Sequence, residues 1–192
     1  MKKIKITNTA PVILAFSLAS LAALILHYLT GGKSTNLLFM SYHSSLASPL
    51  TYVRFFTHAL GHAGWQHFLG NISMILLLGP MLEEKYGSKK ILAIMLITAF
   101  TAGVANYILF PRVGIMGASG IVFAFIMLTS YTSFREGEIP ITVILVALIF
   151  IGQEIWSGIT VSDNVSNFSH ILGGITGSVI GYRLNVKKKA EN

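Results

Sequence analysis

Six long apolar segments divide the chain, and each is close to the length of a membrane span. They cover residues 11–29, 66–82, 90–110, 117–134, 140–156 and 168–184. A bilayer core needs roughly 20 apolar residues in helical form, and lipid offers backbone N–H and C=O groups no partner outside their own segment. The pattern therefore predicts an all-α membrane protein built as a six-transmembrane-helix bundle.

The connection between the first two segments, residues 30–65, is unusually long. Connections of this length are uncommon and often functional. It contains the sequence YVRFF at 52–56, a basic and aromatic cluster suited to the membrane interface. We expect a long first periplasmic loop within one domain over residues 1–192, with no separate soluble domain.

Composition supports a membrane protein. Hydrophobic residues make up 53% of the chain and charged residues 11%, with a mean hydropathy of +0.69, whereas soluble domains carry about 25% charged residues. The basic start followed by an apolar run could be a signal peptide. That run is as long as a full span and further spans follow, so we expect a retained first helix. The absence of cysteine excludes disulfides, thiolate metal sites and a cysteine nucleophile.

The net charge of +7 follows membrane topology better than it follows nucleic-acid binding, for which the chain has no motif. With a cytoplasmic N-terminus, 11 of the 14 basic residues lie inside: Lys2, Lys3, Lys5, Lys85, Lys89, Lys90, Arg135, Arg183, Lys187, Lys188 and Lys189. Lys33, Arg54 and Arg112 lie outside. The positive-inside rule thus predicts that both termini are cytoplasmic.

Polar residues inside spans are costly and are functional candidates. His67 and Asn71 are four residues apart and share one helical face. They are candidates for a site, or for structural hydrogen bonds between helices. His58, His62 and His67 could offer imidazoles to zinc, but the spacing of His62 and His67 is poor for one face and no HExxH motif is present. We therefore predict no metal site.

The last apolar segment has Gly173, Gly177 and Gly181 in one stripe, a pattern that lets helix backbones approach closely. His170 lies at the outer end of this stripe. Ser119, in the glycine-flanked Gly117-Ala118-Ser119-Gly120, begins the fourth segment at a similar depth. The glycines could be only turn residues with Ser119 as a helix cap.

If the stripe packs on the fourth segment, His170 can reach the hydroxyl of Ser119. A histidine base activates a serine nucleophile near neutral pH. Asn71, His67 and the backbone N–H of Ser119 are candidate donors to the oxyanion. Asp163, the only aspartate, stands outside the helix, so the spacing favours a Ser-His dyad and excludes an aspartyl dyad. A G-x-S-x-G elbow is excluded because Ile121 stands where its second glycine would be.

Three motifs, GASG at 117–120, HFLGN at 67–71 and HILGGITG at 170–177, resemble in residues and order the rhomboid intramembrane serine proteases of the bacterial GlpG type. The resemblance covers nearly the whole chain from the first helix onward. It differs at Val53, where the family's first loop has tryptophan before the arginine matched by Arg54, and at Ser169, where alanine is frequent.

The resemblance implies that Ser119 is the nucleophile, His170 the general base, and His67 and Asn71 part of the oxyanion hole. Phe123 takes the place of a tyrosine that stacks on the catalytic histidine. It further implies transmembrane protein substrates, no cofactor, a bacterial inner-membrane location, and a water-filled cavity open to the periplasm and gated by the fifth helix and the following loop.

Two alternatives remain at this point. A small transporter or channel would also have six helices and polar groups, although the chain has no inverted repeats and its polar groups cluster near one face. A catalytically inactive rhomboid-like binding protein is the second, although such proteins lack the serine or the histidine. The sequence leaves open the physiological substrate, the oligomeric state and the roles of His58 and His62.

Overall fold

The structure is a computed structural model that describes residues 9–130 and 164–190, together with residues 141, 144, 145, 148, 149 and 152. Within these residues the chain is helical, and the only β pairing is an isolated bridge between Ser41 and Ile115. The long helices are α1 (Pro11–Leu29), α4 (Trp65–Tyr86), α5 (Ser88–Leu109), α6 (Ser119–Ser130) and α8 (Asn164–Ala190).

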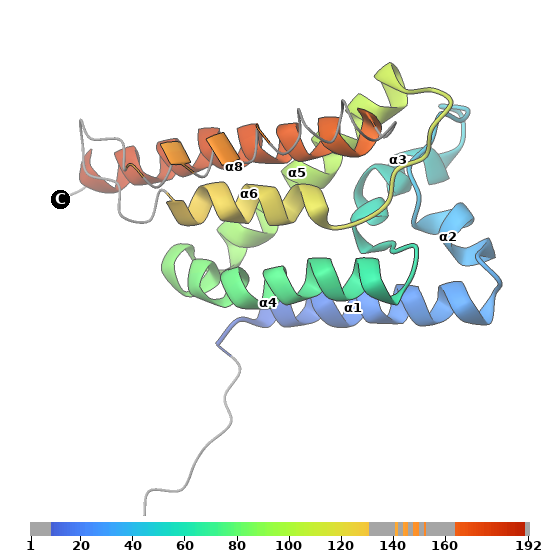
Figure 1. Cartoon of the computed structure of the whole chain (residues 1–192), viewed down its shortest axis with the longest axis horizontal. Helices are drawn as coiled ribbons and strands as arrows, with labels where there is room; N and C mark the ends of the chain where they lie inside the picture. Colours follow the sequence, from blue (N-terminus) through green and yellow to red (C-terminus); the bar gives the residue numbers. More distant parts are fainter. Residues whose placement is uncertain are drawn as a thin grey trace, which may run out of the picture.

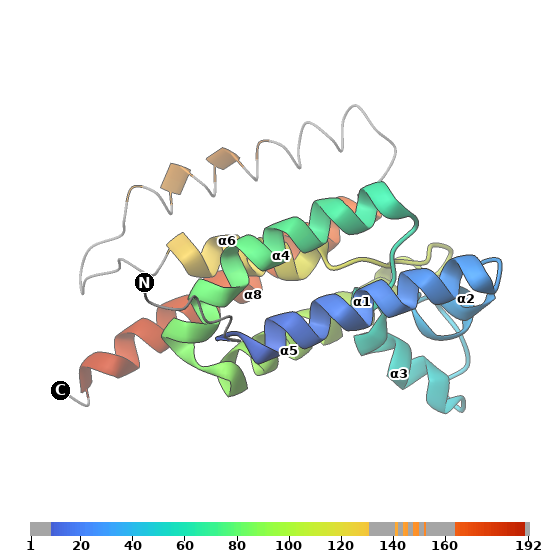
Figure 2. The ribbon, with the colours of Figure 1, turned by 90° about the horizontal axis from the view of Figure 1, so that it is seen from below.

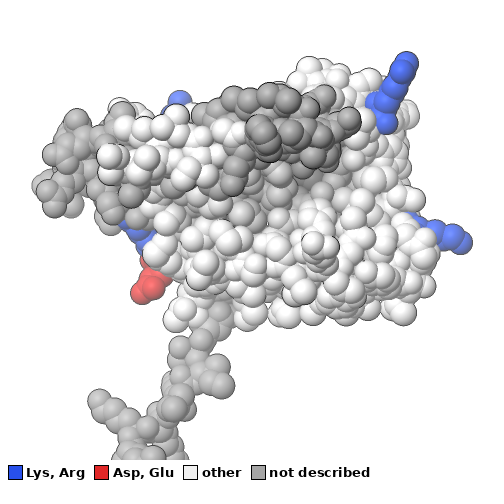
Figure 3. Space-filling model, viewed as in Figure 1, with Lys and Arg blue, Asp and Glu red and all other residues white. Residues whose placement is uncertain are grey.

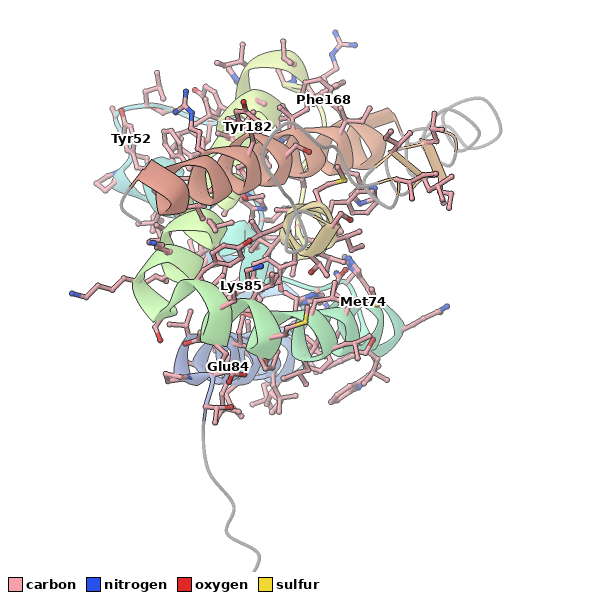
Figure 4. All side chains as sticks on the ribbon, turned by 90° about the vertical axis from the view of Figure 1, so that its left-hand side faces the viewer. Tyr52, Met74, Glu84, Lys85, Phe168 and Tyr182 are labelled. Atoms are coloured by element: carbon pink, nitrogen blue, oxygen red, sulfur yellow. The ribbon has the colours of Figure 1, made fainter. Side chains whose placement is uncertain are left out.

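The long helices form a bundle in which neighbours along the chain are not always neighbours in space. Helix α8 lies along α6, α6 contacts α4, and α4 lies along α1 (Figure 1). Helix α5 contacts all four of the others. Figure 4 shows the side chains between these layers, in a view turned by 90° from that of Figure 1. Met74 of α4 packs there against the buried hydrophobic core.

Two of the predicted spans meet a strict criterion of length and hydropathy among the described residues: α1 and α5. Helix α6 is apolar but shorter over its described part. Helices α4 and α8 have 22 and 27 residues, long enough to span, but are less apolar because they carry polar residues within them and charged residues toward their C-terminal ends. The fifth predicted span, 140–156, lies mostly outside the described residues, so the six-span bundle remains a prediction.

The predicted first loop is not a simple loop. It contains α2 (Lys33–Leu38), α3 (Pro49–Thr57) and the short 3₁₀ helix η1 (His58–Leu60). These elements gather at one end of the bundle, beside α1 and α5 (Figure 1). Proline at the first position of α3 is compatible with helix initiation, because that position needs no backbone N–H donor.

The basic and aromatic cluster at 52–56 is part of α3. Its arginine does not point to the membrane interface, contrary to the expectation from the sequence. Arg54 is buried, with 5% of its surface exposed, and its guanidinium lies over the ring of Tyr42. It donates hydrogen bonds to the Tyr42 and Ser44 hydroxyls. A guanidinium can be buried in this way because hydroxyl acceptors replace part of its hydration, and Arg54 thereby fastens the segment before α3.

The starts of α1 and α5 meet at one buried carboxylate. Glu83, near the end of α4, accepts hydrogen bonds from the backbone N–H groups of Val12 (3.1 Å) and Ile13 (3.0 Å). It also accepts one from the Ser88 hydroxyl at 2.7 Å. The first N–H groups of a helix have no partner within it, and the helix dipole favours a negative charge there. Glu83 therefore ties three helices together at this end.

On the face shown in Figure 3, charged side chains avoid the middle of the surface. Lysine, arginine and glutamate appear near the borders of the face shown in Figure 3, and the described surface between them carries no charge. An uncharged band between charged ends is the distribution that a bilayer requires of a protein that spans it.

Candidate active site

One cavity of about 560 Å³ brings the predicted site residues together. Ser119, His170, His67 and Asn71 all line it, although they come from three helices and are spread over more than a hundred positions of the sequence. Phe123 and Gly117 line it as well. Its remaining lining comes from η1, α5, α6 and the segment before α6, with His58, Thr98 and Met116 among the residues.

Ser119 is the first residue of α6, and the segment that leads to it is held on several sides. Ser41 and Ile115 exchange backbone hydrogen bonds of 2.9 Å each. The side-chain amide of Asn106 donates to the carbonyls of Ser41 (3.2 Å) and Val113 (3.0 Å). These contacts fix the path into α6, so the serine enters the cavity from a helix start, where free N–H groups and the positive end of the dipole lie.

Gly117 brings the backbone before Ser119 against α4. Its φ of +124° suits glycine, and a Cβ there would lie 2.7 Å from both Cε1 and Nε2 of His67. The same Cβ would lie 3.5 Å from Nδ2 of Asn71. Gly117 also donates its N–H to the carbonyl oxygen of His58 at 2.9 Å. Only glycine allows this approach, which sets the His67 ring and the Asn71 amide beside the backbone that carries Ser119.

Asn71 offers an unused donor to the cavity. Its side chain is buried, with 8% of its surface exposed, and its Nδ2 atom has no hydrogen-bond partner among the described residues. A buried donor without an acceptor costs about 1–3 kcal/mol. Because Asn71 also lines the cavity, its amide is available to an oxygen that enters there.

His170 stacks on Phe123. The two rings are 4.4 Å apart between centroids, with an interplanar angle of 8°. Phe123 is one helical turn after Ser119, so this stacking holds the imidazole over the first turn of α6. The contact agrees with the position that the family resemblance gives to Phe123.

The glycine stripe of α8 packs closely on a neighbouring helix, as its spacing predicts, and that helix is α6. A Cβ at Gly173 would lie 2.8 Å from the carbonyl carbon of Gly120, and a Cβ at Gly177 would lie 2.6 Å from Cα of Ala124. Gly120 follows Ser119, and Gly173 lies one turn after His170. The contact between the two glycines therefore sets His170 at the depth of Ser119.

Two histidines beside the cavity have structural partners. Burial lowers the pKa of His58, whose Nε2 is 2.9 Å from the carbonyl oxygen of Ala99. Burial, with the nearby His67, lowers the pKa of His62 to about 4, and its Nδ1 is 3.1 Å from the carbonyl oxygen of Leu60. Both are therefore neutral near pH 7. Among the described residues no group of three His, Cys, Asp or Glu side chains could hold a metal ion.

Comparison with known proteins identifies the family. A model of the Rhomboid domain matches residues 49–186, which is most of the chain. The chain belongs to the rhomboid family. Rhomboid-related protein 2 of Mus musculus is 32% identical over 158 residues, covering 71% of this chain and 52% of the mouse protein. Rhomboid protease GlpG of Haemophilus influenzae is 29% identical over 141 residues, covering 67% of this chain and 68% of that protein.

Family membership makes this chain a membrane protein, as its apolar segments predict. A third relative, Rhomboid-related protein 1 of Caenorhabditis elegans, is 30% identical over 138 residues. The chain spans 52% of the mouse protein and 39% of the nematode protein. The matched region, 49–186, includes every residue of the cavity that the sequence singles out.

Sequence reasoning missed part of the cavity wall. The sequence suggests His58 only as a poor metal ligand, yet its backbone oxygen accepts a hydrogen bond from Gly117, and no motif points to Thr98 of α5. The available signal is a polar side chain within an apolar helix, which Thr98 shares with Thr101. Asp163 and most of the expected gate, the fifth helix with the following loop, lie outside the described residues.

Proposed function

We propose that this rhomboid-family protein is an intramembrane serine protease that cleaves membrane-protein substrates in or near their transmembrane segments. Ser119 is the nucleophile and His170 the general base. The oxyanion hole consists of the Asn71 amide, the His67 ring and the backbone N–H of Ser119. The convergence of these groups in one cavity, with the Asn71 donor unused, is the observation that carries the proposal.

The proposed reaction has two stages. The Ser119 hydroxyl attacks the substrate carbonyl carbon while His170 takes its proton, and the resulting oxyanion accepts hydrogen bonds from the three donors. His170 then gives the proton to the leaving amine, and an acyl-enzyme remains. In the second stage His170 removes a proton from water, the hydroxide formed attacks the ester, and Ser119 regains its hydrogen. No cofactor takes part.

The single membrane domain lies in the bacterial inner membrane in this proposal, with both termini cytoplasmic and the cavity open to the periplasm. The excess of basic residues on one side of the apolar segments supports this orientation. Two other functions, a transporter and an inactive rhomboid-like binding protein, would use the same helices without an activated serine.

A fluorophosphonate probe distinguishes these functions. We expect purified protein in detergent micelles to be labelled at Ser119, and a model transmembrane substrate to be cleaved. Both should be lost in Ser119→Ala and in His170→Ala, and the double variant should be no worse than either single one. Ser73→Ala, which removes an exposed α4 serine, is the matched control. Turnover by Ser119→Ala would contradict the mechanism.

A further inference from the structure

A second cavity, of about 490 Å³, lies between α1, α5 and the α3–η1 segment, outside the candidate active site. Its volume is within the usual range of ligand pockets. Figure 2 shows α1 in front on this side of the molecule. The lining includes Ala15, Phe16 and Ala19 of α1, and Leu92 and Leu96 of α5. We refer to it as the α1–α5 groove.

The chemistry of the α1–α5 groove calls for an apolar occupant. Thr57 is the only residue with a polar side chain in the lining, and its hydroxyl is within hydrogen-bond reach of the carbonyl oxygens of Leu38 and Val53. The groove therefore offers no unused hydroxyl, amide or charge. A peptide strand or a polar ligand would lose its hydration there without replacement, whereas a hydrocarbon chain would lose nothing.

The length of the groove fits one leaflet of a bilayer. On α1 the lining runs from Pro11 to Ala19, which is about 12 Å at the helical rise. On α5 it runs from Leu92 to Ala99, about 10 Å by the same measure. Half of a bilayer's hydrocarbon core is about 15 Å. A lipid acyl chain lying along the helices would occupy the groove over most of its length.

One end of the groove is basic. Glu83 joins the starts of α1 and α5, so Pro11 and Leu92 lie toward the same end of the bundle. Lys89 is one turn before Leu92, and Lys89, Leu92 and Leu96 are spaced as one face of α5. Lys89 is exposed and Lys90 adjoins it. An acyl chain in the groove would therefore place its headgroup beside these lysines, which favours an anionic headgroup.

We propose that the α1–α5 groove binds an acyl chain of an anionic phospholipid, with its headgroup at Lys89. The groove shares a wall with the candidate active site, because Ala59, Ala99 and Ile121 line both cavities. His58 is bonded to the Ala99 carbonyl in that wall. The lipid therefore packs against the groove side of this shared wall. On its other side, the carbonyl oxygen of His58 accepts the hydrogen bond from Gly117.

Photo-crosslinking in vesicles tests the binding site without relying on catalysis. The probes are phosphatidylglycerol and phosphatidylcholine, each with a diazirine in one acyl chain. We expect adducts to concentrate on Phe16, Leu92 and Leu96, well above those on Leu76 and Leu77 of α4, which are 47% and 70% exposed. Adducts spread evenly over these five side chains would overturn the proposal. Cross-links between two chains at the groove would also overturn it, and would assign the groove to a second copy of the protein.

Matched variants make the test specific. Ala19→Phe and Ala15→Phe each fill the groove from an exposed position and should lower adducts on Leu92 and Leu96. Ala93→Phe, exposed on α5 but outside the lining, should not. Lys89→Ala should reduce the preference for phosphatidylglycerol about fivefold, and Lys33→Ala should not. Unchanged adducts in both filling variants would refute the site.

The same preparation separates this proposal from the proposed protease function. Fluorophosphonate labelling of Ser119 without lipid adducts in the groove would contradict only the lipid site. Groove adducts in a protein that neither labels nor cleaves would contradict only the protease.

Discussion

At the scale of single residues, Asn71 gives the most direct test of the cavity. Its Nδ2 atom is buried without an acceptor among the described residues and lies near the backbone of Gly117. If this donor binds the oxyanion mainly in the transition state, Asn71→Ala should lower kcat by on the order of 10²–10³ with little change in KM. A second donor from His67 would reduce the loss.

Stability supplies the control for this variant. Removing a buried donor that lacks an acceptor should leave the thermal midpoint unchanged or raise it, so lost activity could not be ascribed to unfolding. Ser73→Ala, two residues along α4 and exposed, should keep both kcat and the midpoint. Normal kinetics in Asn71→Ala would show that its amide does not bind the oxyanion.

At the scale of elements, the contact between α6 and α8 depends on particular glycines and not on glycine content. Gly173 and Gly174 are adjacent, but a Cβ at Gly173 would collide with the backbone of Gly120, whereas one at Gly174 would meet only Met127 at 3.9 Å. Gly173→Ala should separate the helices and move His170 from Ser119, and a shift of about 1 Å can cost on the order of 10²-fold in rate. Gly174→Ala should keep activity and stabilise α8 by up to about 1 kcal/mol.

Cleavage, fluorophosphonate labelling and thermal stability of both glycine variants form one experiment. Gly177→Ala should behave as Gly173→Ala does, because a Cβ there would meet Cα of Ala124 at 2.6 Å. Equal activity of Gly173→Ala and Gly174→Ala would show that this packing does not set the distance between the two proposed catalytic side chains.

The buried carboxylate that joins α1, α4 and α5 has a matched neighbour. Glu83 has 2% of its surface exposed and accepts three hydrogen bonds, whereas Glu84 is exposed. Glu83→Gln keeps an oxygen but loses the charge at the helix start, at a cost of about 1–2 kcal/mol. We expect the thermal midpoint of Glu83→Gln in detergent to fall by a few degrees, and the midpoint of Glu84→Gln to remain that of the unmutated protein. Equal midpoints would mean that Glu83 does not cap α1.

At the scale of the whole molecule, the hydrophobic pattern and residue spacing predicted the features that depend on residues near one another in the sequence, such as helix bounds and packing faces. The bounds of α1 match the predicted segment, and the glycine stripe predicted that α8 packs closely on a neighbouring helix, although it left open which one. Contacts between distant segments gave no such signal. In the sequence, nothing distinguishes Glu83 from the other charged residues near the end of its helix. The Ser41–Ile115 bridge joins two segments that lack the alternating pattern of a strand. Their roles depend on tertiary packing, which periodicity does not encode.

The orientation of the whole bundle can be tested with single thiols, because the natural chain has no cysteine. Each introduced cysteine is then the only thiol in the protein. Arg112→Cys lies in the segment between α5 and α6, and Lys85→Cys lies near the end of α4, at opposite ends of the long helices. The side chains of Lys85 and Arg112 are both exposed, so the protein should shield neither introduced thiol.

A membrane-impermeant maleimide applied to spheroplasts should label Arg112→Cys at once and Lys85→Cys only after lysis. The reason is the distribution of charge: most basic residues lie on the side of Lys85, and such loops stay in the cytoplasm. Lys33→Cys, at the start of α2, should follow Arg112→Cys, and Lys89→Cys should follow Lys85→Cys. Probe labelling of Ser119 in each variant controls for folding. The reverse pattern would turn the candidate active site toward the cytoplasm, and it would also move the basic end of the α1–α5 groove to the outer leaflet.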